Sequence, residues 1–376
     1  MSWSIKLFKV KGIDIKIHLT FFLILIWAAF RWSGSTGAGL QGALFGVVAT
    51  LLLFAAVTLH ELGHSFQALK FGVKVKDITL MPLGGLAQME EIPENSKQEL
   101  RIAIAGPLVN FAIAALLVAV GAILQTQSVI SLSELSASLG QASWSGLLAY
   151  LTMANLMLGL FNLIPAFPMD GGRVLRALLA RRMDYAQATK IAASVGQGLA
   201  LLFGLWGFMS GNYTLVLIAI FIWMGAGQES KDVQVKDTLR DIKVRQAMTL
   251  NPQTLQANDP LAKALELTLS TAQSNFPVLE WGTNQVVGFL SEPDLLRGLK
   301  EQDERMPVRE AMRTTYPVAA PDEPLYLALE RMRHSRAHAM PVVDPGHQLM
   351  GLLTAVDVNE AYRLLSVSPK MTPIEN

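Results

Sequence analysis

The chain of 376 residues lacks cysteine altogether. Neither a disulfide framework nor a thiolate metal site is therefore available, and any transition metal would have to be held by histidines and carboxylates. An excess of one charge is lacking too, because the formal net charge is +1, which gives no reason to expect a nucleic-acid partner. Charged residues are sparse up to about residue 227 and ordinary in number after it. This contrast predicts a membrane protein that carries a soluble part.

Long apolar runs occupy much of the first part of the chain and predict six membrane spans. They lie at about 18–32, 43–69, 101–124, 145–167, 190–209 and 213–227. The loops between them alternate without exception between several Lys or Arg residues and none. By the positive-inside rule, both termini should face the cytoplasm, with the chain in the plasma (inner) membrane. The sequence thus predicts a polytopic α-helical membrane domain at 1–227 and a linker at 228–242.

An H-E-x-x-H pattern, His60-Glu61-Leu62-Gly63-His64, lies near the end of the second apolar run. On a helix, this spacing places the two imidazoles one turn apart on the same face, so both can bind one metal ion while the carboxylate stays free. Ionisable side chains are energetically costly in a membrane helix, so their presence usually indicates a function. We therefore expect one zinc ion per chain, bound by His60 and His64.

A third protein ligand is needed if the fourth position of the zinc ion is to hold water, and Asp170 is the best candidate. It follows an apolar run in which Pro165 and Pro168 break the helix and free backbone groups that need a protein-lined or wet cavity. Gly171 and Gly172 allow close backbone approach. A capping role at a helix end is the alternative, but the broken helix beside H-E-x-x-H favours the ligand role.

Two polar stretches, 13–18 and 73–80, alternate between apolar and polar residues and predict β-strands at the membrane surface. The second precedes a Pro-Leu-Gly-Gly sequence that ends with Gly84 and Gly85. We predict that the second stretch forms a sheet edge near the active site, where unpaired backbone groups can hold an extended peptide. These glycines are therefore candidates for positioning a substrate, and a plain connecting hairpin is an equally well supported alternative.

Three motifs together resemble a known family. They are H-E-L-G-H at 60–64, A-G-P-L-V-N at 105–110 and N-L-I-P-A-F-P-M-D-G-G-R at 162–173. They resemble the site-2 proteases, intramembrane zinc metalloproteases, and specifically the bacterial and archaeal branch with six spans and C-terminal CBS domains. The resemblance implies that Asp170 is the third zinc ligand and that Asn162 lies at the catalytic centre. It also implies regulated intramembrane proteolysis of a transmembrane substrate such as an anti-sigma factor or another membrane-tethered regulator.

The chemistry expected of these residues is peptide hydrolysis. Zinc lowers the pKa of its bound water to about 7. Glu61 would take the proton as a general base and pass it to the leaving amine. Asn162 could donate a hydrogen bond to the oxyanion of the tetrahedral intermediate.

The rest of the chain contains an internal repeat. Val244–Met248 recurs as Val308–Met312, and Gly288–Asp294 recurs as Gly351–Asp357. Each copy predicts the order strand, helix, strand, strand, helix, with the copies at 243–302 and 303–366 and a tail at 367–376. The pair resembles an α/β tandem CBS domain.

In the CBS family, the G-x-x-[ST]-x-x-D segment contacts an adenine nucleotide. The resemblance implies that Ser291 and Thr354 bind phosphate, and that Asp294 and Asp357 hold ribose hydroxyls. ATP or another adenine nucleotide would then regulate the membrane domain. A repeat that only mediates homodimerisation is the alternative, because many such modules bind nothing.

Two other functions fit part of the sequence. A nucleotide-regulated transporter or channel predicts charged residues on several spans, whereas here they concentrate at two motifs. A catalytically silent membrane scaffold would be favoured by loss of Glu61 or Asp170, and both are present. The sequence therefore favours an intramembrane zinc metalloprotease. Its expected partners are a transmembrane substrate, membrane lipid and a second copy of the chain.

Overall fold

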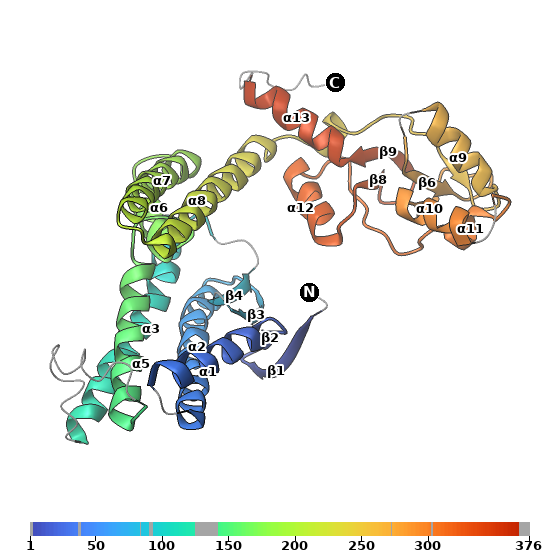
Figure 1. Ribbon diagram of the computed structural model, residues 1–376. Helices are drawn as coiled ribbons and strands as arrows, with labels where there is room; N and C mark the ends of the chain where they lie inside the picture. Colours follow the sequence, from blue (N-terminus) through green and yellow to red (C-terminus); the bar gives the residue numbers. More distant parts are fainter. Residues whose placement is uncertain are drawn as a thin grey trace. The chain divides into compact units, whose positions relative to one another are not determined.

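The computed structural model describes residues 3–36, 39–82, 84–89, 93–124, 142–271, 273–301 and 304–367 (Figure 1). Most of the predicted loop at 125–144 and of the tail at 367–376 lies outside these ranges. The chain divides into two compact units, Met1–Ser230 and Lys231–Asn376. The first contains long apolar helices and a small sheet, and the second contains short strands and helices. The predicted fold class, a helical membrane domain followed by an α/β repeat domain, is confirmed.

Six of the seven described helices of the first unit agree with the apolar runs, although one of the six is short, and the helix at Asp170–Leu179 was not predicted by any run. In the described residues the helices are α1 (Phe21–Thr36), α2 (Leu40–Lys70), α3 (Ser96–Ile123), α5 (Trp144–Asn162), α6 (Asp170–Leu179), α7 (Tyr185–Met209) and α8 (Tyr213–Leu239). Five of these described helices, α2, α3, α5, α7 and α8, are long and apolar enough to cross a membrane. The first predicted span is the shorter α1, whose 16 residues rise about 24 Å, against a hydrocarbon core of about 30 Å.

The ends of helices α5 and α8 differ from the ends of the apolar runs. Helix α5 stops at Asn162 because Pro165 and Pro168 cannot continue it, and α6 begins at Asp170. Helix α8 continues to Leu239, so residues 228–239 of the predicted linker are helical. No proline or glycine interrupts the chain between Gly227 and that end. The linker is therefore mostly a continuation of the last apolar helix.

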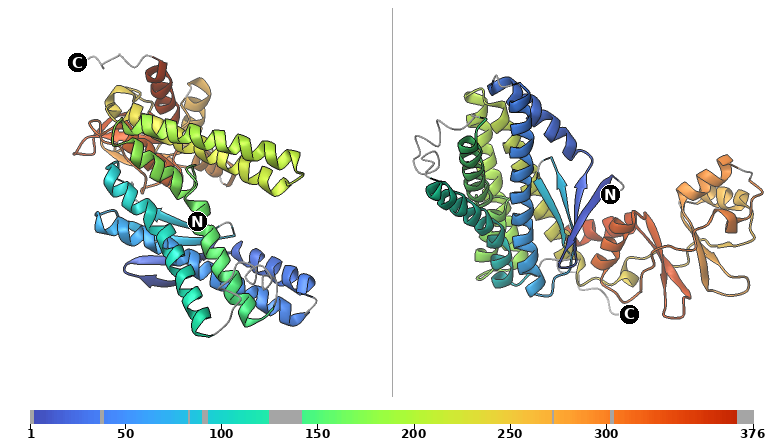
Figure 2. Two further views of the ribbon diagram at one scale, coloured as in Figure 1. Left: turned by 90° about the vertical axis from the view of Figure 1, so that its left-hand side faces the viewer. Right: turned by 90° about the horizontal axis from the view of Figure 1, so that it is seen from below.

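A four-stranded sheet accompanies these helices. Its strands are β1 (Ser4–Val10), β2 (Ile13–His18), β3 (Val75–Met81) and β4 (Gly84–Met89), in the order β1-β2-β3-β4. β2 and β3 pair in parallel, and the other pairs are antiparallel. Both predicted strand stretches are strands, whereas β1 and β4 were not predicted. The prediction that 73–80 forms a sheet edge is wrong, because β3 pairs with β2 on one side and with β4 on the other. Ile15 and Ile78 are buried together with Phe54 and Leu62 of α2, so one face of the sheet packs on α2 (Figures 1 and 2).

The second unit is built from the repeat. Its elements are η2 (Val244–Gln246), β5 (Leu255–Gln256), α9 (Leu261–Ser270), β6 (Phe276–Leu279), β7 (Val286–Leu290), α10 (Glu292–Glu301), α11 (Val308–Ala311), α12 (Leu325–Ser335), β8 (Ala339–Val343), β9 (Leu349–Thr354) and α13 (Ala355–Val367). The first copy has the predicted element order. In the second copy the predicted first strand is only a single bridge, between Ala319 and Val342. Pro317 and Pro321 flank this bridge and cannot donate backbone hydrogen bonds, which limits the pairing.

The V-R-x-A-M segment of each copy packs against the core of the other copy. Val244 is buried in the core of the second copy, and Val308 is buried in the core of the first. Gly288 leaves room for a methionine of the segment from the other copy, since a Cβ there would lie 2.3 Å from Met312 Sδ. Each copy is therefore completed by the other, and the domain limits within the repeat stay a prediction.

Candidate metal centre

Three side chains from two distant parts of the chain converge in the first unit. His60 and His64 lie one turn apart on α2, and Asp170 is the first residue of α6. Asp170 Oδ2 lies 3.3 Å from His60 Nε2 and 3.1 Å from His64 Nε2, and the two Nε2 atoms are 3.1 Å apart. All three side chains are buried. One nitrogen or oxygen from each residue therefore faces a common point.

The other ring nitrogen of each histidine has a hydrogen-bond acceptor. His64 Nδ1 donates to the carbonyl oxygen of Ile102 at 2.7 Å, and His60 Nδ1 donates to Asn110 Oδ1. Asn110 is oriented in turn, because its Nδ2 donates to Asn155 Oδ1 at 3.0 Å. In a neutral imidazole, donation from Nδ1 leaves a lone pair on Nε2. Two such lone pairs and a carboxylate oxygen face one another, a donor set that fits a zinc ion with three protein ligands.

Space at this point is kept by a glycine of α3. A Cβ on Gly106 would lie 2.1 Å from His64 Nε2 and 2.7 Å from His60 Nε2. Sequence reasoning assigned no role to Gly106, Asn110 or Asn155. The A-G-P-L-V-N motif was the available signal for the first two, whereas Asn155 is a single polar residue in an apolar run.

Asp170 reaches the histidines because the chain turns tightly before α6. A Cβ on Gly171 would lie 2.2 Å from the carbonyl oxygen of Ile164, and one on Gly172 would lie 2.6 Å from the backbone nitrogen of Phe167. Only glycine permits this approach of backbone to backbone. The turn therefore places the first residue of α6 beside α2.

The strand β4 passes beside Glu61. A Cβ on Gly85 would lie 2.6 Å from Glu61 Cγ, so the glycine lets the strand and the carboxylate come together. Gly84 has a φ of 137°, a conformation that other residues rarely adopt. β4 is at the edge of the sheet. The structure thus brings Glu61, Gly84 and Gly85 to one place.

Asn162 has a less direct relation to the cluster. It is the last residue of α5 and is half-buried. Its Nδ2 donates to the carbonyl oxygen of Leu158 at 3.0 Å, within its own helix. The amide would have to leave this bond to donate to a substrate.

The four predicted nucleotide-binding residues cap two helices of the second unit. Thr354 Oγ1 and backbone N–H both donate to Asp357 Oδ2 at 2.8 Å, and Asp357 N–H donates back to Thr354 Oγ1 at 3.2 Å. This is the reciprocal pattern of a capping box before α13. Ser291 likewise donates to Asp294 before α10. The S/T-x-x-D pattern therefore has a structural use in both copies.

Asp294 also has charged neighbours. Asp294 pairs with Arg297 and accepts hydrogen bonds from Arg313 Nε at 2.7 Å and Nη2 at 3.0 Å. Burial raises the pKa of Asp294, but hydrogen bonds from Arg313 and Ser291 outweigh it and hold the pKa below its ordinary value. The charge of Asp294 is thus already balanced within the protein.

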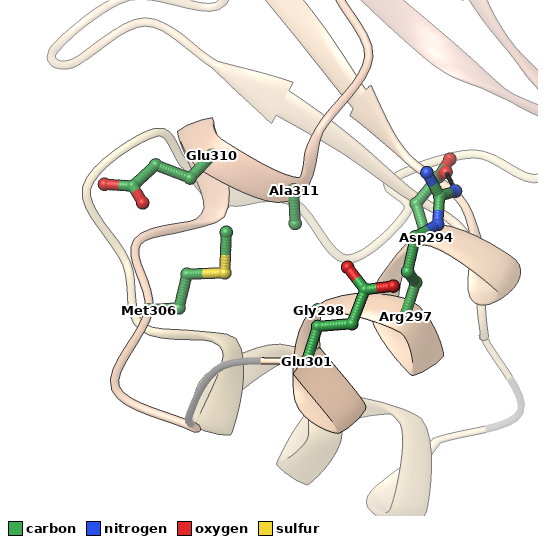
Figure 3. A pocket seen from close by; sticks show the side chains of 7 residues that line it. All are labelled: Asp294, Arg297, Gly298, Glu301, Met306, Glu310 and Ala311. Carbon is green, nitrogen blue, oxygen red and sulfur yellow. Dashed lines mark hydrogen bonds and ion pairs between the residues drawn. The ribbon is translucent and has the colours of Figure 1, made fainter.

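A pocket lies beside Asp294 (Figure 3). Its other lining residues are Arg297, Gly298, Glu301, Met306, Glu310 and Ala311. Its volume of about 150 Å³ is below the roughly 300–1,000 Å³ of pockets that hold drug-sized ligands. Two carboxylates, Glu301 and Glu310, would also repel a phosphate. A nucleotide would therefore need this region to open, or would need to bind elsewhere in the repeat.

A helical membrane unit with a buried His-His-Asp cluster is typical of a membrane-embedded metalloenzyme, and comparison with known proteins agrees. The model of peptidase family M50 matches residues 48–203, and the CBS domain model matches 240–301 and 308–364. A zinc metalloprotease of Methanocaldococcus jannaschii is 36% identical over 371 residues, which cover 99% of each chain. Stage IV sporulation protein FB of Bacillus subtilis is 29% identical over 194 residues, 51% of this chain and 57% of that protein.

A solved structure of a site-2 protease from Methanocaldococcus jannaschii is 44% identical and covers 61% of this chain and 95% of that chain, with a TM-score of 0.43. The chain belongs to peptidase family M50, the site-2 proteases, and carries a pair of CBS domains. It is a zinc metalloprotease, and its family supports intramembrane proteolysis as its general activity.

Proposed function

We propose that His60, His64 and Asp170 bind the catalytic zinc ion and that the chain cuts peptide bonds within the membrane. The observation that carries this proposal is the convergence of the three ligand atoms, all within 4.8 Å of one another. The Nδ1 contacts leave Nε2 of both histidines able to coordinate. When bound there, zinc supplies a Lewis acid that makes water a nucleophile at neutral pH.

Glu61 is the proposed general base. It lies between the two histidines in sequence, so helical spacing places it off the face that the two ligands share and leaves its carboxylate free for proton transfer. It takes the proton of the attacking water and delivers it to the leaving amine. Asn162 is proposed to stabilise the oxyanion after its amide leaves the carbonyl oxygen of Leu158.

The substrate is proposed to bind as an added strand at β4. A transmembrane helix hides its carbonyl groups in its own hydrogen bonds, so it must unwind before attack. Within the described residues β4 is the outermost strand of the sheet, and Gly85 lies next to Glu61, which supports a role of this edge in holding the unwound stretch. The substrate class that fits is a single-span, membrane-tethered regulator such as an anti-sigma factor.

The orientation of the chain in the membrane is proposed from the charges of its loops. The alternation of Lys and Arg supports a plasma (inner) membrane location with both termini in the cytoplasm. The repeat is proposed to bind an adenine nucleotide such as ATP, through Ser291, Asp294, Thr354 and Asp357, and to mediate homodimerisation. The nucleotide would change the fraction of membrane domains that admit substrate.

The decisive test is cleavage of purified single-span substrates by the purified full-length protein, with zinc analysis of the same sample. Wild type should cut within the apolar segment and contain one zinc ion per chain. Removal of zinc with a chelator should stop cleavage, and added zinc should restore it. A metal-free preparation that cuts at the normal rate would contradict the proposal.

A further inference from the structure

Arg176 of α6 is fully buried, at 1% exposure, and is held by side chains from three other helices. Its Nε donates to Glu99 Oε1 of α3 at 2.7 Å, and its Nη1 donates to Glu229 Oε1 of α8 at 2.6 Å. The Tyr185 hydroxyl of α7 donates to the same Glu99 oxygen at 3.3 Å. One guanidinium therefore joins α6 to α3 and α8, and α7 completes the group.

The faces of the guanidinium are occupied as well. Its central carbon lies 5.0 Å from the ring centre of Phe167 and 4.8 Å from that of Tyr185. Arginine is suited to this position, because its planar fork pairs with carboxylates while its faces stack on aromatic rings. Buried ion pairs often stabilise a protein no better than well-packed apolar residues do. The arrangement therefore calls for a reason other than stability, and geometric specificity is one.

Helix α6 needs external restraint. It has ten residues, and isolated helices shorter than about 12–15 residues are marginal in water. Asp170 is its first residue, and Arg176 lies six residues later, a rise of about 9 Å. The tight glycine turn fixes one end of the helix, and the Arg176 contacts fix the other. Rotation or sliding of α6 would move the Asp170 carboxylate away from the histidines.

Helix α3 connects the two halves of the metal centre. The Ile102 carbonyl and Asn110 of α3 orient the two histidines, and Glu99 of the same helix holds Arg176. One helix, α3, therefore sets both the orientation of the histidine rings and the position of α6. Glu229 adds α8, which continues as a helix to Leu239.

We propose that Arg176 is a positioning residue for the metal centre, which holds the Asp170 carboxylate where it can share a metal ion with the two histidines. Glu99 is its main partner. Glu229 gives α8 a smaller influence on the same geometry, because its side chain is 33% exposed and water can partly replace it. This proposal rests on the metal site proposed above.

The test removes both members of the buried Glu99–Arg176 pair. The one charged partner that remains, Glu229, has a side chain that is 33% exposed and can be solvated. In the full-length protein, Glu99→Leu combined with Arg176→Met should fold, because apolar replacement of a buried pair is often neutral. Zinc affinity per folded chain, measured by competition with a chelator, should fall about tenfold, the lower end of effects seen when groups behind metal ligands are changed. The visible absorption of the Co²⁺-substituted protein should also change, because it reports coordination geometry. Arg331→Met with Glu323→Leu, which removes a less buried Arg–Glu pair of the second unit, is the control and should change neither.

Unchanged zinc affinity and an unchanged Co²⁺ spectrum in the folded double variant would overturn the proposal. Arg176→Lys, which keeps the charge and loses the fork, gives a second reading that does not depend on the double variant folding. It should weaken zinc binding by several-fold, and zinc affinity equal to wild type would equally overturn the proposal. A wild-type protein that binds no zinc would contradict the proposed function instead, so the two failures are distinguishable.

Discussion

Two buried aspartates, one in each unit, occupy the same kind of local position and have different surroundings. Asp170 lies in the first turn of α6 and Asp294 in the first turn of α10, and both helices have ten residues. Asp170 faces His60 and His64. Asp294 instead faces arginines and a serine hydroxyl. A buried carboxylate by itself therefore does not define a binding site, because its neighbours decide whether its charge is already balanced.

The two aspartates differ because the side chains around them carry their protons in different places. Arg313 is always protonated and donates directly to Asp294, so the charge of this carboxylate is balanced by the protein itself. The protons on Nδ1 of His60 and His64 are used by Asn110 and the Ile102 carbonyl oxygen. With these protons on Nδ1, the Nε2 atoms present lone pairs and no positive charge to Asp170, an arrangement that a divalent cation would complete. On this reasoning Asp170 is expected to bind a metal ion, whereas Asp294 would have to give up these partners to hold a nucleotide.

The largest expected difference between the two aspartates is in metal binding. Asp170→Ala, like His60→Ala or His64→Ala, should weaken zinc binding more than about 100-fold. Changing a residue that only hydrogen-bonds to a metal ligand already lowers metal affinity about 10–100-fold. Asp294→Ala should leave the zinc content at the wild-type value. Metal analysis after gel filtration checks both. Equal zinc content in the two variants would remove the distinction between these aspartates.

A variant at Glu61 should distinguish metal binding from catalysis. Glu61→Gln should keep zinc and reduce the cleavage rate by about 10²–10⁴-fold, the usual contribution of a general base. The measurement is the cleavage rate of a single-span substrate at equal zinc content. A Glu61→Gln protein that cuts at the normal rate would refute the mechanism.

Gly106 tests whether space at the metal centre matters. Gly106→Ala places a Cβ among atoms about 2.1–2.7 Å away, so it should displace a histidine and weaken zinc binding at least tenfold. Gly198→Ala of α7 is the matched control, because a Cβ there meets nothing within 4 Å among the described residues. The control should bind zinc normally and be slightly more stable, since alanine favours helix. Normal zinc affinity in Gly106→Ala would show that the cluster opens more than the structure indicates.

A smaller effect is expected from nucleotide. A ligand that prefers one state tenfold shifts an equilibrium by only about 1.4 kcal/mol. ATP should therefore modulate the cleavage rate by up to about tenfold. Asp294→Ala with Asp357→Ala should abolish this modulation while zinc-dependent cleavage persists. Calorimetry without any ATP binding to the full-length protein would leave the repeat as a dimerisation module.

The smallest predicted effect concerns pH. Because the pKa of folded Asp294 is lowered, its contribution to the free energy of unfolding is present above its ordinary pKa of about 3.9 and is lost as the pH falls through the lowered value. The thermal stability of wild type relative to Asp294→Asn should thus be greater at pH 7 than at pH 3. A difference that does not change with pH would mean that the arginines around Asp294 contribute no net stabilisation.

The sequence identified the parts of this protein whose signals are local. Long apolar runs predicted the long helices but not α6, and the alternation at 13–18 and 73–80 predicted β2 and β3. It did not predict β1 or β4, whose stability as strands depends on pairing with β2 and β3. It also placed a first strand in the second repeat copy where two prolines leave only a bridge. A helix or a turn follows from neighbouring residues, but a strand also depends on a partner that can be distant in the chain.

The same division holds at the metal centre. His60, Glu61, His64 and Asp170 could be proposed from spacing and from the broken helix, because metal chemistry restricts which residue types can serve. What tertiary structure alone decided is how these residues are held: α3 provides Asn110 and the space at Gly106, and α6 is restrained through Arg176. The contacts that hold them join residues far apart in the chain, by 38 positions between His64 and Ile102 and by 77 between Arg176 and Glu99. Sequence spacing fixes neighbours on one helix, whereas the packing of separate helices decides which distant groups complete the site.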